Sequence, residues 1–244
     1  MKKAFILLTL FAIGTLFSGI STVMAGGDPS QGAIGIGYKN KDSESDDPLI
    51  ESPDTLAIQS ADNASVLDDE EIYHLKFIRE EEKMARDVYR VLLGTWGNSI
   101  FANITESEQN HMDAVANLLA FYKIDDPVMS DETGAFTDEL IGQIYSDLVE
   151  RGSTSEIDAL LVGAYIEEYD ILDIWYAYDH TDEDRIKKVY QNLYEGSYNH
   201  LDAFVHVYES VAGATYEPDL LSDEEYDYVM SFETQANQSQ GSKN

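Results

Sequence analysis

Apolar residues recur at spacings of three and four along four long stretches of the chain, which is the pattern of an α-helix with one buried face. The predicted helices run from about Asp68 to Leu93, Ile100 to Tyr122, Thr154 to Tyr178 and Asp182 to Val211. A shorter helix is predicted from Thr137 to Glu150, with Thr137 as its N-cap and Gly152 as its stop, and a weak one from Asp223 to Phe232. No stretch of useful length alternates apolar and polar residues as a strand does, so we predict an all-α protein.

The four long helices are predicted to pack as an antiparallel bundle, because they are similar in length and each has an apolar stripe. The long link between the second and third helices contains the short helix and lets the chain cross the bundle. Gly94 and Gly97 are expected to end the first helix, and Gly213 the last. The predicted apolar faces are Leu75, Ile78, Ala85, Tyr89 and Leu92; Ile104, Met112, Val115, Leu118 and Leu119; Leu161, Ala164, Ile171, Ile174 and Trp175; and Ile186, Val189, Leu193, Ala203, Phe204 and Val207.

The regions outside this bundle differ from it in composition. Residues 1–25 read as a signal peptide, with Lys2 and Lys3, an apolar run from Ala4 to Phe17, and small residues before Gly26. The apolar run is shorter than the ~20 residues a spanning helix needs. We therefore expect an extracytoplasmic protein, with an uncleaved membrane tether as the alternative. Residues 26–66 are predicted to be a disordered polar linker, 67–212 the bundle, and 213–244 a tail with one weak helix.

The charge of the chain limits its partners. Of its 244 residues 15 are basic and 47 acidic, which gives a formal net charge of -32. Such a surface repels nucleic acid and anionic lipid, so neither is an expected partner, and it attracts cations. There is no cysteine, which excludes disulfides, iron–sulfur clusters and thiolate zinc sites. Any metal site must therefore use His, Asp and Glu, the ligands of iron, manganese, zinc or calcium.

Acids and histidines occupy several positions on the predicted apolar faces, where charged side chains are rarely buried without a partner. On the first helix, Glu82 lies between Ile78 and Ala85. On the second helix, Glu108 and His111 are three residues apart, so that both side chains can reach one metal ion. Both sets are predicted to ligate metal, although Glu82 taken alone is equally well read as a solvated acid.

The third and fourth helices add further candidate ligands near their middles, so all four sets would meet at one level of the bundle. Glu167 and Asp170 are again three residues apart, and His200 lies one turn after Ser197. Turning the third helix to bury its apolar stripe favours Glu168, whereas the spacing of the acids favours Glu167, which we choose. The predicted metal ligands are Glu82, Glu108, His111, Glu167, Asp170 and His200.

This set meets most of the pattern of di-iron carboxylate bundles, in which two helices supply one Glu each and the other two supply Glu-x-x-His. Ser197 stands where the fourth helix should supply its Glu. Asp170 is a candidate to replace the missing charge. Alternatively, one of the two metal positions is weak or is completed by water.

Four motifs carry a resemblance to known families: Arg79–Lys83, Ser107–Met112, Ile166–Ile171 and Gly196–Leu201. Residues Glu82–Tyr89 are similar to the first-helix motif of rubrerythrin-type proteins. From about residue 67 to residue 209, the chain resembles the ferritin-like family called domain of unknown function 2202. The resemblance implies a ferritin-like four-helix bundle with a di-metal centre, and it implies no particular reaction. Without cysteine the chain lacks the rubredoxin-type iron site that accompanies rubrerythrin.

We therefore expect a possible di-iron oxidoreductase, in which two ferrous ions react with oxygen or peroxide, with manganese or zinc as other candidate metals. The alternative is a non-catalytic metal-binding or scavenging protein of the cell exterior. A metal-free surface interaction module ranks last, because it would bury several acids together without a cation. The oligomeric state is not predicted.

The remaining tyrosines and histidines support two weaker predictions. Four tyrosines near the proposed centre either hydrogen-bond its ligands or carry oxidising equivalents, or they simply fill a wet, acidic bundle. His74 is expected at the surface or behind the ligands, and His180 and His206 at the surface. The four tyrosines are Tyr89, Tyr165, Tyr169 and Tyr198.

Overall fold

The computed structural model describes the backbone of residues 66–241 and the side chains of residues 66–232. The predicted signal peptide and the predicted linker before residue 66 lie outside these residues. All regular secondary structure in the described part is helical, without a strand, so the all-α prediction is confirmed. None of the described helices is long and apolar enough to cross a membrane. The helices are α3 (Asp69–Trp96), α4 (Ser99–Tyr122), α5 (Glu139–Gly152), α6 (Glu156–Asp179), α7 (Asp184–Ala212) and α8 (Asp223–Gly241).

Local capping chemistry sets the helix ends. Asp68 opens α3 with a capping box, in which its side chain accepts the Glu71 N–H and the Glu71 carboxylate accepts the Asp68 N–H, both at 2.9 Å. Asn98 caps α4 with its side-chain oxygen, which accepts the Ile100 N–H. Gly97 and Gly213 follow α3 and α7 with φ of 70° and 64°, the left-handed conformation that glycine adopts without strain.

Two of the predicted helix boundaries are wrong. Gly94 lies inside α3, three residues before the glycine that ends the helix. The N-cap of α5 is Asp138, whose carboxylate accepts the N–H groups of Leu140 and Ile141. Thr137 precedes this cap, and its own N–H donates to Glu80 at 2.5 Å.

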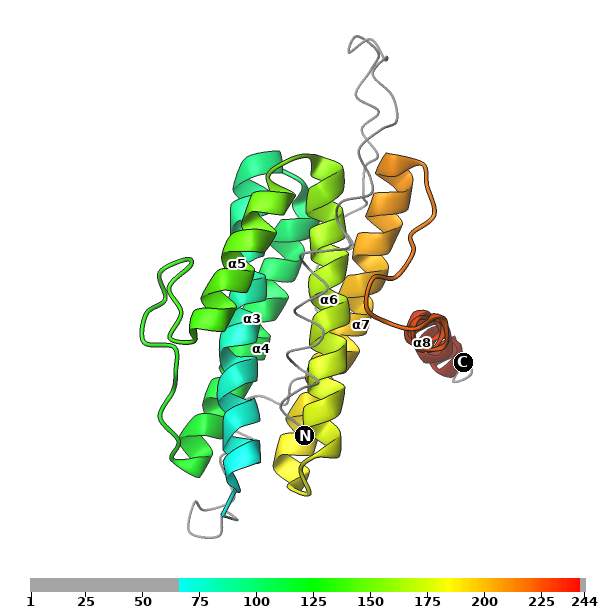
Figure 1. Ribbon diagram of the computed structural model, residues 1–244. Helices are drawn as coiled ribbons and strands as arrows, with labels where there is room; N and C mark the ends of the chain where they lie inside the picture. The colour runs from blue at the N-terminus through cyan, green and yellow to red at the C-terminus, as the bar shows by residue number, and fades with distance from the viewer. Residues whose placement is uncertain (1–65, 242–244) are drawn as a thin grey trace. The chain divides into compact units, whose positions relative to one another are not determined.

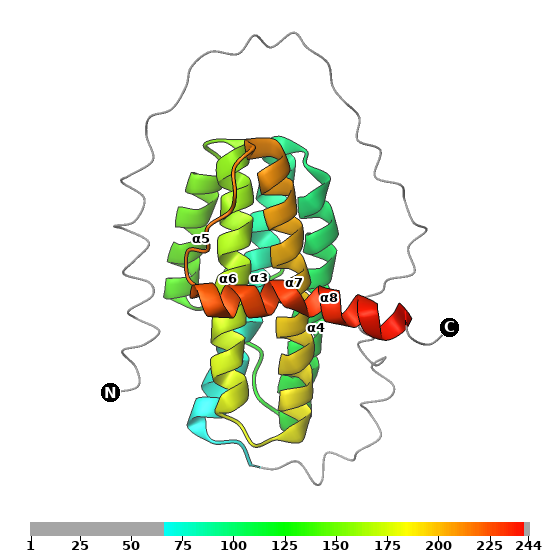
Figure 2. The same cartoon turned by 90° about the vertical axis from the view of Figure 1, so that its right-hand side faces the viewer.

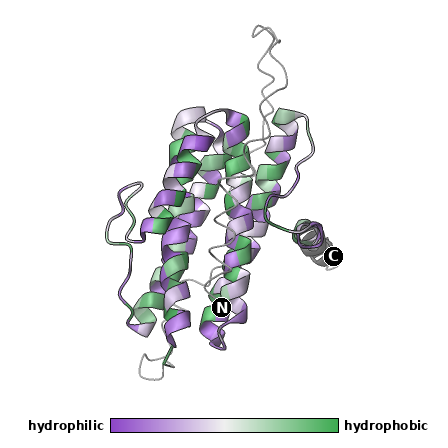
Figure 3. Cartoon of the chain, viewed as in Figure 1, coloured by the Kyte–Doolittle hydropathy of each residue, from purple (hydrophilic) through white to green (hydrophobic). Residues whose placement is uncertain are grey.

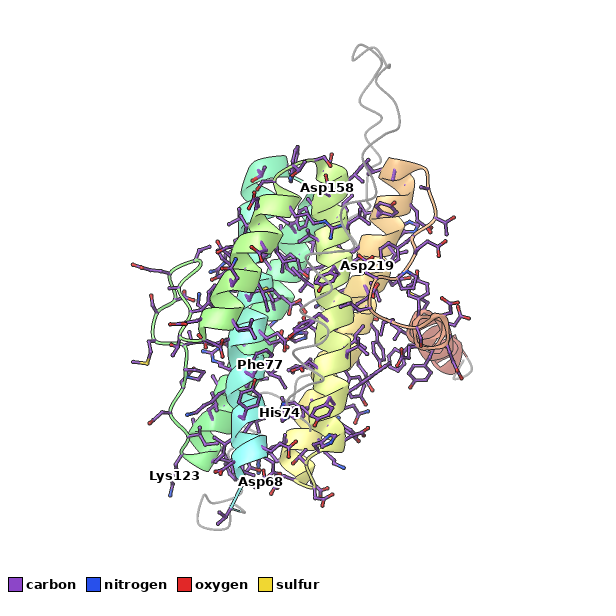
Figure 4. The ribbon with its side chains drawn as sticks, viewed as in Figure 1. Asp68, His74, Phe77, Lys123, Asp158 and Asp219 are labelled. Atoms are coloured by element: carbon purple, nitrogen blue, oxygen red, sulfur yellow. The ribbon has the colours of Figure 1, made fainter. Side chains whose placement is uncertain are left out.

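The four long helices pack in two pairs, α3 with α4 and α6 with α7, and α5 contacts α3 and α6 (Figures 1 and 2). Two residues join α3 to α4, so the pair is antiparallel, and Asp68 and Lys123 mark the same end of it (Figure 4). Every long helix has both hydrophobic and hydrophilic residues (Figure 3). Its apolar side enters a core that includes Leu75, Ile78, Val115, Leu118, Leu119, Ile174, Ala177, Ile186, Val189, Tyr190 and Leu193.

The link between α4 and α5, residues 123–138, returns along the bundle (Figure 1) and is held by side chains of α3. Arg79 donates to the Asp126 carboxylate at 3.1 Å. The Glu80 carboxylate accepts the backbone N–H groups of Thr137 at 2.5 Å and Asp138 at 2.9 Å. Glu80 therefore points toward the link, which covers and buries it.

A buried ion cluster reinforces the same link. Lys83, Arg86 and Asp87 are fully buried, and both cations pair with the Asp87 carboxylate, at 2.5 and 2.9 Å. Lys83 also donates to the Glu132 carbonyl at 2.8 Å, and Asp87 accepts the Gly134 N–H at 3.0 Å. Removing Asp87 alone would leave the buried Lys83 without its carboxylate partner, which costs roughly 3–5 kcal/mol in such sites, whereas Arg86 would keep its ion pair with Asp131.

The segment after α7 packs back onto the bundle, and α8 lies across α6 and α7 (Figure 2). The rings of Tyr198 in α7 and Phe232 in α8 lie 5.1 Å apart. Trp175, predicted on the core stripe of α6, is only half-buried and packs against Tyr198 and Tyr228 instead. Leu161 is likewise half-buried, so the inner face of α6 is rotated from the predicted one.

Candidate metal centre

Two neighbouring helices bring the first group of candidate ligands together. Glu82 projects from α3, and Glu108 and His111 project from α4, where their three-residue spacing places them on one face. The Nδ1 atom of His111 lies 2.9 Å from Glu108 Oε2 and 3.3 Å from Glu82 Oε2. All three side chains are buried, and their ligand atoms lie within 4.8 Å of one another.

The second group shares Glu108 with the first. His200 of α7 places its Nδ1 atom 2.9 Å from Glu108 Oε1 and 3.3 Å from Glu167 Oε2 of α6. These three ligand atoms also lie within 4.8 Å of one another. One carboxylate thus turns an oxygen toward each histidine, and the imidazole rings stand 5.5 Å apart.

Several atoms that face this space have no hydrogen-bond partner within the described residues. They are Glu82 Oε1, Glu108 Oε1, Glu167 Oε2 and His200 Nδ1. Buried polar atoms are nearly always paired, so lone-pair atoms gathered in this way are suited to a cation.

The electrostatics of the metal-free centre agree with this. Burial raises the pKa of Glu82 to about 8, although the neighbouring His111 opposes the shift. Burial would lower the pKa of His200, but the charges of Glu108 and Glu167 outweigh it and raise the pKa to about 10. The pKa of Glu108 is lowered because His200 and His111 outweigh the effect of its burial. In the metal-free centre, protons on the two imidazoles thus supply the positive charge that a bound cation would supply.

The donor set fits a pair of transition-metal ions. Three carboxylates and two imidazoles suit iron, manganese and zinc, which take O and N ligands. Each group offers one imidazole and two carboxylates, and the two groups share Glu108. Carboxylates and Glu-x-x-His sets projecting inward are the ligands of di-metal bundles.

Neighbouring residues fix the orientation of these ligands. The Tyr89 hydroxyl donates to Glu167 Oε1 at 2.5 Å. Ser107 Oγ lies 2.9 Å from His200 Nε2. A Cβ atom at Gly196 would lie 2.6 Å from His111 Nε2, so the absence of a side chain there makes room for the ring. The roles of Ser107 and Gly196 were missed from sequence, although both stand inside motifs that carry the family resemblance.

Comparison with known proteins identifies the family of this chain. The model of the family described as an uncharacterized protein domain, DUF2202, matches residues 71–233. The chain belongs to the DUF2202 family. It is 47% identical over 169 residues to the uncharacterized protein MJ0754 of Methanocaldococcus jannaschii, a match that spans 69% of this chain and 91% of that protein. The crystal structure of the hypothetical protein MJ0754 matches with a TM-score of 0.67, covering 69% of this chain and 95% of that one.

The structure places the two adjacent acids of α6 differently. Both are buried, but only Glu167 contacts a histidine of the centre, His200. The Glu168 carboxylate accepts the Tyr216 hydroxyl at 2.6 Å and the N–H groups of Leu220 at 2.5 Å and Leu221 at 2.9 Å. The N–H of Asp219 adds a contact at 3.2 Å. Glu168 therefore anchors the segment before α8, a contact that no local pattern in the sequence signals.

Two further candidates of the DUF2202 motifs lie outside both groups. Ser197 donates to the Leu193 carbonyl at 3.2 Å, and α7 supplies His200 but no carboxylate to the two groups. Asp170 is fully buried beside the centre, and neither of its oxygens has a hydrogen-bond partner. The structure thus assembles Glu82, Glu108, His111, Glu167 and His200, and it leaves Asp170 adjacent.

The remaining histidines and tyrosines have varied surroundings. His74 is buried against Tyr176, which excludes the surface position among its two predicted alternatives, while His180 and His206 are exposed as predicted. Of the four tyrosines weighed from the sequence, Tyr89 alone hydrogen-bonds a residue of the two groups among the described contacts. The Tyr198 hydroxyl accepts the Trp175 indole N–H at 2.8 Å, on the side of α8.

Proposed function

We propose that this chain is a ferritin-like four-helix metalloprotein whose centre binds a pair of iron ions and reacts with oxygen or peroxide. One observation carries the proposal. Glu108 stands between two histidines on separate helices, and each histidine turns Nδ1 toward two carboxylate oxygens at 2.9–3.3 Å. Five inward side chains from four helices, three of them acids, have no role in a metal-free core, where buried charge is strongly unfavourable.

In this proposal Glu82 and His111 would hold one ion, Glu167 and His200 would hold the other, and Glu108 would belong to both groups. Electron transfer to oxygen or peroxide is the chemistry that a ferrous pair supplies when bound. The chain contributes geometry and exclusion of water, because all five residues are buried. Tyr89 fixes the Glu167 carboxylate by donating to its second oxygen.

The test is the metal content of protein purified without chelator and then loaded with ferrous iron under nitrogen. We expect about two ions per chain in the parent. His111→Ala and His200→Ala should each lose at least one of them, since each removes the only nitrogen ligand of one group. His206→Ala is the matched control, an exposed histidine on the same helix as His200. Equal metal content in the parent and both ligand variants would refute the centre.

Admitting air to the ferrous protein then separates the two functions. Fast oxygen uptake with a new near-ultraviolet absorbance band, both lost in His111→Ala, supports the redox protein. Tight binding with only slow oxidation, at the rate of ferrous iron in buffer, supports metal scavenging, for which the net charge of -32 is the favouring observation. Export, expected from residues 1–25, remains part of the proposal for either function.

A further inference from the structure

Two buried arginines of α3 stand on either side of Glu82. Arg79 precedes Glu82 by three residues and Arg86 follows it by four, so the three side chains share one face of the helix. Arg79 is 8% exposed, and Arg86 is fully buried. A guanidinium that is removed from water needs acceptors for its N–H groups. For both arginines these acceptors include a group on α4 and an acid in the link before α5.

On α4, each acceptor directly follows a residue of the Glu-x-x-His set. Arg79 Nη1 donates to the carbonyl oxygen of Met112, the residue after the histidine, at 3.0 Å. Arg86 Nη1 donates to the side-chain oxygen of Gln109, the residue after the glutamate, at 2.5 Å. The side-chain nitrogen of Gln109 donates in turn to Asp113, one turn further along α4, at 2.9 Å. The Gln109 amide is therefore oriented from both sides.

The contact between candidate ligands lies between these two hydrogen bonds. Glu82 Oε2 is 3.3 Å from His111 Nδ1. Glu82 falls between the two arginines on α3, and His111 falls between their two acceptors on α4, as the antiparallel packing of the helices requires. Three polar contacts thus join α3 to α4 in succession, and the middle one belongs to the centre.

The link 123–138 fixes both guanidinium groups from the other side. Arg79 Nη2 lies 3.1 Å from Asp126 Oδ2, and Arg86 Nη1 lies 2.7 Å from Asp131 Oδ1. Arg86 also pairs with Asp87 of its own helix at 2.9 Å. Each arginine therefore connects α3, α4 and the link, and neither can follow a movement of one of them without losing a partner in another.

This arrangement matters because metal ligation tolerates little displacement. A helix rises about 1.5 Å per residue, whereas metal–ligand distances hold to within about 0.2 Å. A slide of α3 along α4 by a fraction of one residue would therefore separate Glu82 from an ion held by His111. Apolar packing is non-directional and resists such a slide weakly. The fixed fork of a guanidinium resists it strongly, because a slide would leave buried N–H groups without acceptors.

We infer that Arg79 and Arg86 are positioning residues, which hold α3 and α4 in the register that brings Glu82 to Glu108 and His111. The inference rests on the proposed function, in which this group of three binds a metal ion. It makes the two groups of the centre unequal. The second group takes its other residues from α6 and α7, so its affinity should depend much less on the contacts of the arginines.

Gln109→Leu is the sharpest variant, because it removes one acceptor of Arg86 without changing the charge of the chain. Arg86 keeps its ion pairs with Asp87 and Asp131, so the variant should fold. Gln191→Leu is the matched control, since Gln191 donates to Glu195 one turn along α7 as Gln109 donates along α4. Binding of Mn²⁺ is measured from the loss of the free-ion electron paramagnetic resonance signal.

The variant is tested in two backgrounds that each leave one group complete. In a His200→Ala chain, which keeps the group of Glu82 and His111, Gln109→Leu should weaken Mn²⁺ binding roughly tenfold, as losses behind metal ligands commonly do. In a His111→Ala chain it should leave Mn²⁺ binding unchanged, and the control should change neither. Equal weakening in both backgrounds would show a general loss of structure and refute the positioning role, as would no weakening in either.

A second measurement does not require the histidine variants to fold. Arg79→Lys keeps the positive charge but replaces the guanidinium fork with a single ammonium group. In the otherwise unchanged chain it should weaken one of the two Mn²⁺ ions and leave the affinity of the other at the parent value. Two unaltered affinities would refute the role of Arg79 while leaving the centre intact. A parent chain that binds no Mn²⁺ would instead refute the centre and this inference with it, so the two failures are distinguishable.

Discussion

His200 and Ser107 meet between α7 and α4, with His200 Nε2 2.9 Å from the Ser107 hydroxyl oxygen. An imidazole that donates from Nε2 keeps its Nδ1 lone pair free, and Nδ1 is the atom that faces Glu108 and Glu167. A hydrogen bond to the outer nitrogen of a metal-binding histidine sets both its tautomer and its ring orientation. Ser107 directly precedes Glu108, so the same turn of α4 supplies the candidate ligand Glu108 and orients the candidate ligand His200.

Ser107→Ala should therefore weaken metal binding while preserving the fold. Losing a hydrogen bond behind a ligand typically lowers metal affinity about 10–100-fold, and we expect a loss of that order, measured by competition with a chelator of known affinity. Ser146→Ala is the control, because that hydroxyl donates to a backbone carbonyl on the exposed side of α5. Equal affinity in the Ser107→Ala chain and the parent would show that the Ser107 contact does not orient His200.

Gly196→Ala tests whether close packing holds His111 in place. The new methyl group would lie 2.6 Å from Nε2 and 2.9 Å from Cε1 of the His111 ring. The ring must then move from its contacts with Glu82 and Glu108. We expect a loss of stability of about 1–3 kcal/mol, the usual result of overpacking, together with a lower metal content.

Gly94→Ala is the matched control for that change. It also lies inside a long helix, but no atom comes within 4 Å of the added methyl group. Replacing a helical glycine by alanine gains up to about 1 kcal/mol, so this chain should melt higher and bind metal like the parent. A Gly196→Ala chain that also melted higher, with full metal content, would contradict the packing described for His111.

Glu168→Ala and Glu167→Ala should have different consequences, although the residues are adjacent. The first removes the acceptor of Tyr216 and of backbone N–H groups in the segment before α8. Leaving buried donors unsatisfied costs about 1–3 kcal/mol, so stability should fall while the metal content of folded protein stays at the parent value. Trp175, which packs against Tyr228 of α8, should report the loosened segment by fluorescence. Loss of metal in Glu168→Ala at unchanged stability would reverse the assignment of the two acids.

The helices and most of the candidate ligands follow from sequence because helical spacing is a local property. A Glu and a His three residues apart on an apolar stripe face the same way in any bundle, which fixes Glu108 with His111. Glu82 and His200 follow from the same argument on their own stripes. The position of each residue in its own helix, and not a contact with a distant part of the chain, decides where these side chains point.

The inner face of α6 could not be derived in this manner. Nearly every side of that helix is covered by another element, including α5, α7 and the segment before α8, so apolar residues such as Trp175 occur outside the core stripe. The directions of the acids on α3 could not be derived either, because a run such as Glu80–Glu82 has the pattern of a solvent-exposed helix face. Each of these acids has different surroundings: Glu80 accepts the Thr137 N–H of the link, Glu82 contacts His111 of α4, and the Glu81 oxygens have no hydrogen-bond partner in the described residues.

Metal binding should strengthen as the pH rises, because the ions compete with protons on the histidines. The charges of Glu108 and Glu167 hold the pKa of His200 at about 10, and neighbouring carboxylates also raise that of His111. In the metal-free protein the protonated imidazoles stabilise the fold fully below the unfolded pKa of about 6.5. That contribution is then lost as the pH rises through about 10. A ligand nitrogen must be deprotonated, so apparent affinity should increase from pH 6 to pH 8 by up to about tenfold per unit for each proton released. Calorimetric titrations in buffers of different ionisation enthalpy would count these protons, and affinity independent of pH with none released would show that the histidines do not ligate the ions.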